Sequence, residues 1–317
     1  MYKASNIEIV ILTYNRSYLL RDTIKSIINQ TAPGSNIIVY DNGSTDNTMV
    51  VVEEFLGYGV SYIKNNVNNH LGAWNEIKNI CSREWLIVFH DDDIMHPEYI
   101  QSALHMINKY PNISLVCSNM YQFENISDIK LEMDLGIAHY NFDKLSGFAN
   151  LLYKGFPIPF CSAIYKTSVF KLLNVEFDIF DKMFDRPFMM NASAYGSVVV
   201  LKRKYIYVRK HTNQDSCTIS NGKYTNAIIS LNKFYYTALG SNFFTKTGRT
   251  FLFKSYNRLY GSYLWMGAKS SGRTFPGFLY IAKSNGAISS FAIIIGFFFD
   301  FLFGIASRQI KKYFFRY

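Results

Sequence analysis

The sequence predicts an α/β fold in which a mostly parallel sheet is flanked by helices. Short apolar segments rich in β-branched and aromatic residues alternate with segments whose apolar residues recur at helical spacing. This alternation is typical of βαβ units. With 317 residues, 49% of them hydrophobic, the chain can bury a sizeable core, and its length indicates a large domain with a smaller module.

The elements of the N-terminal half follow in a regular order. Residues 19–28 place Leu19, Leu20, Ile24, Ile27 and Ile28 on one helix face, and residues 50–55 form a second helical segment. Four predicted strands lie around and between such segments. They are residues 7–12 (IEIVIL), 36–41 (NIIVYD), 60–65 (VSYIKN) and 85–90 (WLIVFH).

The pattern is looser beyond residue 110. Residues 114–118 and 162–166 have strand composition, and 197–208 form one long strand or two short ones. Residues 157–160 (PIPF) form a loop, with Gly155 before it. From about residue 224 the chain is aromatic and basic, with amphipathic helical segments, so we place a domain boundary near residue 220, between 1–220 and 221–317.

Polar clusters follow three of the predicted strands: TYNR after the first, DNGS at the end of the second and HDDD at the end of the fourth. Open α/β sheets bind ligands beyond the carboxyl ends of their strands. We therefore expect a ligand site at this edge of the sheet.

The acidic cluster lies within FHDDDIMHPEY, residues 89–99. Adjacent carboxylates raise one another's pKa values unless a cation lies among them. One interpretation is a turn that caps a helix starting near Pro97. The other is a site for Mg²⁺ or Mn²⁺, which take oxygen ligands and bridge carboxylates to phosphates. The motif alone leaves both open.

The cysteines and the N-terminus indicate an intracellular domain. Cys81, Cys117, Cys161 and Cys217 form no CxxC pair, so we expect core thiols, not a zinc site or a disulfide framework. Residues 1–6 run directly into a strand-like segment, so no cleavable signal peptide is expected.

The net charge of +10 lies entirely in the C-terminal part. Residues 241–317 contain eleven Lys and Arg residues and one acidic residue, Asp300, whereas the 22 bases and 22 acids before them cancel. This distribution does not indicate a nucleic-acid-binding surface spread over the protein.

The apolar segment 287–306 is about long enough to cross a bilayer, and basic residues follow it. A carboxylate near the middle of a spanning helix is costly, so Asp300 favours an interfacial or re-entrant membrane anchor over a full span. A buried soluble helix would leave the adjacent basic tail unexplained. The expected partner is a membrane surface with anionic lipids, and the expected location is the cytoplasmic face of the cell membrane.

An ordered set of motifs resembles the inverting family-2 glycosyltransferases of bacterial surface-polysaccharide type, which have the GT-A (Rossmann-like) fold. The resemblance covers roughly residues 5–217. The motifs are ILTYNRSYLL, VYDNGSTDNT, GAWNE, FHDDDIMHP, FDRPFMMNASAYG and YVRKHTNQDS.

The resemblance implies a nucleotide-binding set. Thr13, Asn15 and Arg16 would hold the nucleobase and ribose, Asp41 would accept a hydrogen bond from the base, and Asn42 would help the backbone turn close to the ligand. Asn75 matches the last residue of a pattern that usually reads Ala-Arg-Asn, with Trp74 in place of the arginine.

It also implies Mn²⁺ or Mg²⁺ as cofactor. When the family pattern is aligned on Pro97, His90 takes the place of its first Asp, and Asp92 matches the direct metal ligand. Asp91 and Asp93 would contact the ribose, metal-bound water or nearby cations. The YVRKH ending implies His211 at the metal or diphosphate and Arg209 at phosphate oxygens. The metal would stabilise the diphosphate leaving group.

Inverting transfer also needs a general base. Counting back from Gly196 by the family spacing gives Asp185, with Asp181 as the alternative. Phe184 stands where the family usually has Glu, and Asn191 where it has Arg.

The expected function is transfer of one sugar from a nucleotide-diphosphate sugar, with a UDP-sugar as the expected donor, to a hydroxyl of a lipid-linked saccharide acceptor. Two alternatives are a catalytically inactive membrane-bound sugar- or nucleotide-binding protein, suggested by the departures at 74, 90, 184 and 191, and a sugar-1-phosphate nucleotidyltransferase. The latter needs a Gly-rich loop with Arg after the first strand, which TYNR does not supply.

Overall fold

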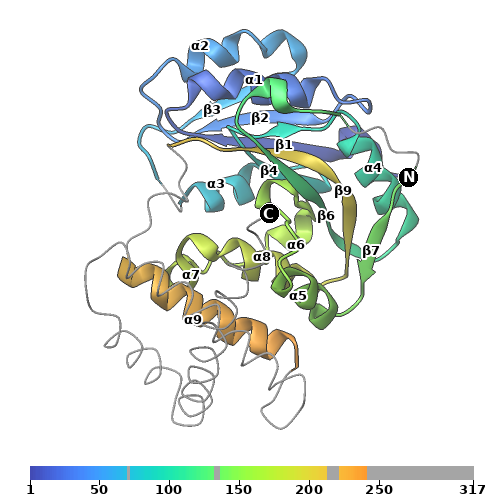
Figure 1. Ribbon diagram of the computed structural model, residues 1–317. Helices are drawn as coiled ribbons and strands as arrows, with labels where there is room; N and C mark the ends of the chain where they lie inside the picture. Colours follow the sequence, from blue (N-terminus) through green and yellow to red (C-terminus); the bar gives the residue numbers. More distant parts are fainter. Residues whose placement is uncertain (70–71, 132–135, 213–220, 241–317) are drawn as a thin grey trace, which may run out of the picture. The chain divides into compact units, whose positions relative to one another are not determined.

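The computed structural model describes residues 1–69, 72–131, 136–212 and 221–240 (Figure 1). The chain divides into two compact units. The first comprises Met1–Asp178 and Phe184–Thr218, and the second comprises Ile179–Met183 and Ile219–Tyr317.

The N-terminal half of the first unit is a series of βαβ units. Its strands agree with the predicted segments to within one residue at each end. The elements are β1 (Ile7–Thr13), α1 (Ser17–Ile28), β2 (Asn36–Asp41), α2 (Thr48–Glu53), β3 (Val60–Lys64), α3 (Gly72–Ile80) and β4 (Trp85–His90). In Figure 1, α1 and α2 lie on one side of the strands β1–β3 and α3 lies on the other.

The rest of the chain adds shorter elements. They are β5 (Ile94–Met95), α4 (Tyr99–Lys109), β6 (Ile113–Phe123), β7 (His139–Phe142), α5 (Leu145–Tyr153), β8 (Ile164–Lys166), α6 (Thr167–Phe170), α7 (Phe177–Phe180), α8 (Asp185–Ala192), β9 (Ser197–Arg209) and α9 (Asn221–Ala238). Short 3₁₀ helices lie at Ala4–Asn6 (η1), Leu56–Tyr58 (η2), Ile126–Asp128 (η3), Phe160–Ser162 (η4) and Asp181–Met183 (η5).

The sheet is mixed, and the predicted parallel pairing is found in its longer ladders. Within the described part of the chain, nine strands form one sheet in the order β3-β2-β1-β4-β8-β6-β9-β5, with β7 also paired to β9. Strands β1 to β4 pair in parallel, as do β6 and β9. The short strand β8 lies antiparallel between β4 and β6, and β5 and β7 are antiparallel to β9. Antiparallel pairs need no crossover helix, so the alternation pattern did not predict them.

The core forms around the central strands. Residues 85–89 of β4 are at most 2% exposed, because the sheet is covered on both faces and the strand is apolar throughout. Helix α1 contributes Leu20, Ile24 and Ile27 to the same core. Each fully buried side chain of this size stabilises the fold by roughly 1.5–3 kcal/mol. This packing fixes the strand ends from which the polar loops emerge.

The second unit contains α9, where the ring of Phe234 packs at 90° against Phe180, with centroids 5.9 Å apart. No helix among the described residues is both long and apolar enough to cross a bilayer. The predicted anchor, 287–306, and the basic segment 241–317 lie outside the described residues.

Candidate functional site

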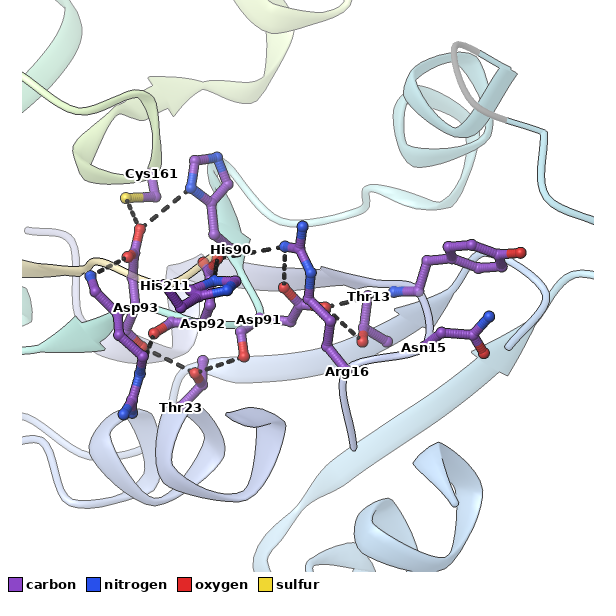
Figure 2. Close-up of polar contacts among 12 residues, drawn as sticks. Thr13, Asn15, Arg16, Thr23, His90, Asp91, Asp92, Asp93, Cys161 and His211 are labelled. Carbon is purple, nitrogen blue, oxygen red and sulfur yellow. Dashed lines mark hydrogen bonds and ion pairs between the residues drawn. The ribbon is translucent and has the colours of Figure 1, made fainter. Parts of the chain in front are cut away.

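The carboxyl ends of the central strands carry the predicted site residues. Thr13, Asp41 and His90 are the last residues of the parallel strands β1, β2 and β4, and Arg209 is the last residue of β9. The loops that follow bring Arg16, three carboxylates and His211 together, as Figure 2 shows. The edge predicted from the polar clusters is therefore where these side chains gather.

Asp91 lies against the loop after β1. The Thr13 hydroxyl donates to its Oδ2 at 2.8 Å, and Nη1 of Arg16 donates to its Oδ1 at 3.1 Å. Burial raises the pKa of Asp91 to about 6, although the charge of Arg16 opposes the shift; the neighbouring charge of Asp92 adds to it. Thr13 and Arg16, both predicted to hold the nucleotide, thus donate hydrogen bonds to the Asp91 carboxylate.

Asp92 joins two loops that are far apart in sequence. Its Oδ2 accepts a hydrogen bond from Nη1 of Arg16 at 3.3 Å and lies 2.9 Å from Nε2 of His211. The side chain of Asp92 is only 8% exposed. The predicted metal ligands Asp92 and His211 are therefore in direct contact, with a cationic side chain beside them.

Both carboxylate oxygens of Asp93 have partners within the protein. Its Oδ1 accepts the backbone N–H of Arg209 at 3.1 Å. Its Oδ2 accepts the Cys161 thiol at 3.0 Å and lies 3.2 Å from Nδ1 of His90. Burial and the charge of Asp93 raise the pKa of the Cys161 thiol well above its usual value, which keeps it a neutral donor.

Thr23 connects helix α1 to this acidic turn. Its hydroxyl lies 2.9 Å from the backbone oxygen of Asp91 and 2.9 Å from that of Asp93. Sequence reasoning did not identify Thr23, and it treated Cys161 only as a core thiol. Each contact joins residues more than sixty positions apart, so no local pattern could have indicated it.

His90 lies beside the acidic turn, with 46% of its side chain exposed. Desolvation lowers its pKa, but the hydrogen bond to Asp93 and the charges of the three carboxylates raise it to about 9. His90, Asp93 and Cys161 are also close enough together to hold a metal ion, the one such group found in the described part of the chain. A thiol in that set suits softer metals than Mg²⁺.

The pair Asp92 and His211 fits a hard divalent metal better. Adjacent ligands of an octahedral ion with bonds of about 2.1 Å lie about 3.0 Å apart, close to the observed 2.9 Å between Oδ2 and Nε2. The other ring nitrogen of His211, Nδ1, is buried without a hydrogen-bond partner among the described residues. These two side chains could therefore share one ion.

The loops after β1 and β2 are tied to each other. The backbone N–H of Asn15 donates to Oγ of Ser44 at 2.9 Å, and the N–H of Thr45 donates to Oδ1 of Asn15 at 2.8 Å. Asn15 has a φ of 51°, a left-handed conformation that Asn tolerates better than most residues. The two predicted nucleotide loops thus form one connected surface.

Asp41 and Asn42 belong to a buried polar network. Asp41 accepts the N–H of Ser44 at 2.7 Å through Oδ1 and the hydroxyl of Tyr62 at 2.5 Å through Oδ2. The amide oxygen of Asn42 accepts from the backbone of Asn69 at 3.0 Å. Tyr62, on β3, was not predicted, because a tyrosine in a strand is ordinarily read as a packing residue.

Gly43 is the residue that this turn requires. Its φ is 88°, and a Cβ built on it would lie 2.7 Å from the backbone carbon of Val67. Gly43→Ala is therefore expected to lower the free energy of unfolding by about 1–3 kcal/mol, measured by urea denaturation. Gly34→Ala is the matched control, because Gly34 has a φ of 99° and open space around it. Equal losses in the two variants would contradict the contact with Val67.

Asp185 is the first residue of α8. It is half-buried, and its Oδ1 accepts the N–H of Arg186 at 2.8 Å. Burial raises its pKa, while the charges of Arg186 and, more weakly, His90 lower it. A raised carboxyl pKa is suited to a general base. The role of Asp185 as that base stays a prediction.

Two predicted residues have different surroundings. Asn75 is exposed on α3. The guanidinium of Arg209 donates to Oδ2 of Asp22 at 3.3 Å and to the backbone oxygen of Asp92 at 3.1 Å. It also lies 4.8 Å from the centre of the Phe123 ring. Its role at phosphate oxygens stays a prediction.

An α/β sheet with carboxylates, an arginine and a histidine at its strand ends is consistent with a GT-A enzyme. The sequence profile described as Glycosyl transferase family 2 matches residues 8–173, and the chain belongs to that family.

Individual relatives agree with this assignment. An uncharacterized glycosyltransferase of Haemophilus influenzae is 31% identical over 35% of this chain and 37% of its own length. Glycosyltransferase GlyA of Streptococcus pneumoniae is 27% identical over 64% of this chain and 29% of its own length. The matched segments thus span well under half of each relative.

Among solved structures, S. aureus TarS 1-349 in complex with UDP-GlcNAc has a similar fold. The TM-score is 0.56 at 17% sequence identity, over 80% of this chain and 72% of that one.

Proposed function

We propose that this protein is an inverting, metal-dependent glycosyltransferase that moves a single sugar from a UDP-sugar to a hydroxyl of a lipid-linked saccharide. The observation that carries the proposal is the meeting of Arg16 and His211 on Oδ2 of Asp92, at the carboxyl ends of parallel strands. A cation, an imidazole and a carboxylate at that edge form a site suited to a diphosphate and its metal.

The donor is inferred from the two connected loops. The polar side chains of these loops provide donors and acceptors for a base and a ribose. Asp41 and Thr13 are buried and bond to neighbouring protein groups, so they hold the loops in place. TarS, which shares the fold at low identity, has been solved with UDP-GlcNAc and so supports a UDP-sugar as the first candidate.

The metal, Mn²⁺ or Mg²⁺, would be held by Asp92 and His211. When bound, such an ion neutralises the diphosphate and so makes it a better leaving group. Asp93 was expected near the metal, at the ribose, metal-bound water or nearby cations, but both its oxygens have protein partners. We therefore assign Asp93 to holding the acidic turn in place, and Arg16 to balancing the charge of Asp91 and Asp92.

Asp185 acts as the base in this mechanism. It takes the proton of the acceptor hydroxyl as that oxygen attacks the anomeric carbon of the donor sugar. The bond from this carbon to the phosphate oxygen breaks, and the nucleoside diphosphate leaves with the electron pair. Attack opposite the leaving group inverts the anomeric configuration.

The acceptor and location rest on the sequence. The +10 charge of residues 241–317 and the apolar segment 287–306 favour a chain held at the cytoplasmic face of the cell membrane, on anionic lipids. An acceptor linked to a lipid would lie at the same surface, as needed for assembly of a surface polysaccharide such as a capsule or O-antigen.

Isothermal titration of the full chain with UDP, GDP and dTDP, each with Mn²⁺ and with EDTA, tests the donor site. We expect one nucleotide, UDP, to bind only with Mn²⁺, and Asp92→Ala to abolish that binding. Binding of UDP with equal affinity in EDTA would contradict the metal assignment. If no nucleotide binds, the donor assignment is wrong.

A further inference from the structure

Two departures from the family pattern, Trp74 and Phe184, contact each other in the fold. They lie on different elements, Trp74 in α3 and Phe184 directly before α8. Their ring centroids are 5.4 Å apart with an angle of 80° between the planes. This is the edge-to-face arrangement that aromatic pairs favour.

Trp74 is also the centre of a larger ring cluster. It is 8% exposed and contacts three further rings, each at most 6% exposed. The centroid distances from Trp74 are 5.1 Å to Phe160, 6.3 Å to Phe170 and 6.0 Å to Phe188. These rings would desolvate a charged group at position 74, which favours the apolar Trp74 there. Next to Trp74, an aromatic side chain at position 184 is more favourable than a carboxylate, which would lose its hydration.

The cluster packs against the first turn of α8. Phe184 is the N-cap residue, and the N–H of Phe188 donates to its backbone oxygen at 3.0 Å. Both rings of this turn therefore pack on Trp74. Asp185 projects from the same turn, and the hydrogen bond that the described residues give its carboxylate comes from the adjacent Arg186. The direction of the carboxylate thus depends on where the turn is held.

We propose that Trp74 and Phe184 are positioning residues for the general base, holding the first turn of α8 against α3 so that the Asp185 carboxylate meets the acceptor hydroxyl. The assignment rests on the proposed function. It implies that each of these two departures from the family pattern compensates for the other, so that together they leave the site functional.

Phe184→Leu tests the assignment, because it keeps an apolar side chain but removes the ring. The assay measures UDP release from a UDP-sugar, with Mn²⁺ and with water as the acceptor. The panel is UDP-GlcNAc, UDP-GalNAc, UDP-glucose and UDP-galactose. We expect kcat to fall about 10- to 100-fold, the KM for the donor to stay within about twofold, and the acid limb of the pH–rate profile to move.

Phe55→Leu is the matched control. Phe55 is only 5% exposed, and its ring contacts Tyr58 outside the cluster around Trp74. Its replacement should lower the melting temperature while leaving kcat and the pH profile of the folded protein close to the parent. Phe184→Tyr, which restores a ring, should recover most of the parent kcat.

The outcomes separate the two claims. If Phe184→Leu and Phe55→Leu lose the same factor of kcat and neither moves the pH profile, the rings are merely structural and the positioning assignment is wrong. If the parent releases UDP but Phe184→Leu matches it, the assignment alone fails. A parent that turns over no UDP-sugar would overturn the proposed function and this assignment with it.

Discussion

Replacing Asp185 with Asn is expected to lower the rate of sugar transfer by about 10²- to 10⁴-fold while leaving the affinity for UDP and Mn²⁺ unchanged. The amide keeps the size of the side chain and its ability to accept the Arg186 N–H, seen at 2.8 Å. It cannot take a proton from the acceptor. The loss should therefore fall on kcat, and the donor KM should stay near that of the parent.

The pH dependence follows from the same residue. Burial raises the pKa of Asp185 above the usual 3.8. The base works only when deprotonated, so activity should be full above this raised pKa and should fall as the pH drops through it. The acid limb of kcat should thus lie above the range of a solvent-exposed aspartate in the parent and be absent from the residual rate of Asp185→Asn.

Asp181→Asn serves as the control for this assignment, since Asp181 was the alternative candidate from the sequence. It belongs to the second compact unit and has a φ of 48°, a conformation that Asn tolerates as well as Asp does. We expect its kcat to stay near the parent value. If instead Asp181→Asn is inactive and Asp185→Asn transfers sugar at the parent rate, the base is misassigned.

The sequence predicted the N-terminal half of the fold well because its signals are local. Strands β1, β2 and β4 are rich in apolar and β-branched residues, and the helix between the first two has its apolar residues on one face. The antiparallel strand pairs were not predicted. Strand β8 has three residues and enters between β4 and β6 through contacts that no periodicity encodes.

In the candidate site, too, the residues at strand ends could be predicted, and some of their contacts could not. The strand ends located Thr13, Arg16 and Asp92, since parallel strands bring their carboxyl ends to one edge. The resemblance placed His211 and Asp92 at the same metal, and the two side chains are in contact. The thiol partner of Asp93 could not be predicted, because Cys161 reaches the acidic turn only through the tertiary fold. The sequence likewise presented Trp74 and Phe184 as separate departures, and their contact is visible only in three dimensions.

Asp92→Asn and Asp93→Asn are expected to fail in different ways, although the two residues are adjacent. The oxygen Oδ2 of Asp92 meets a cation and an imidazole at the site, so its loss should lower transfer about 10³-fold. The free energy of unfolding should change less than in Asp93→Asn, because the amide also removes the repulsion between Asp92 and the carboxylates on either side of it. The assay is metal-dependent UDP release, with urea unfolding measured on the same samples.

Asp93→Asn should instead destabilise the fold by about 1–3 kcal/mol, because an amide cannot accept from all three of its present partners. Its carboxylate is 1% exposed and receives the Arg209 N–H and the Cys161 thiol, with His90 beside it. UDP release by the folded fraction should exceed that of Asp92→Asn at least tenfold. The opposite pattern, a stable but inactive Asp93→Asn and an active Asp92→Asn, would move the metal to the group formed by His90, Asp93 and Cys161.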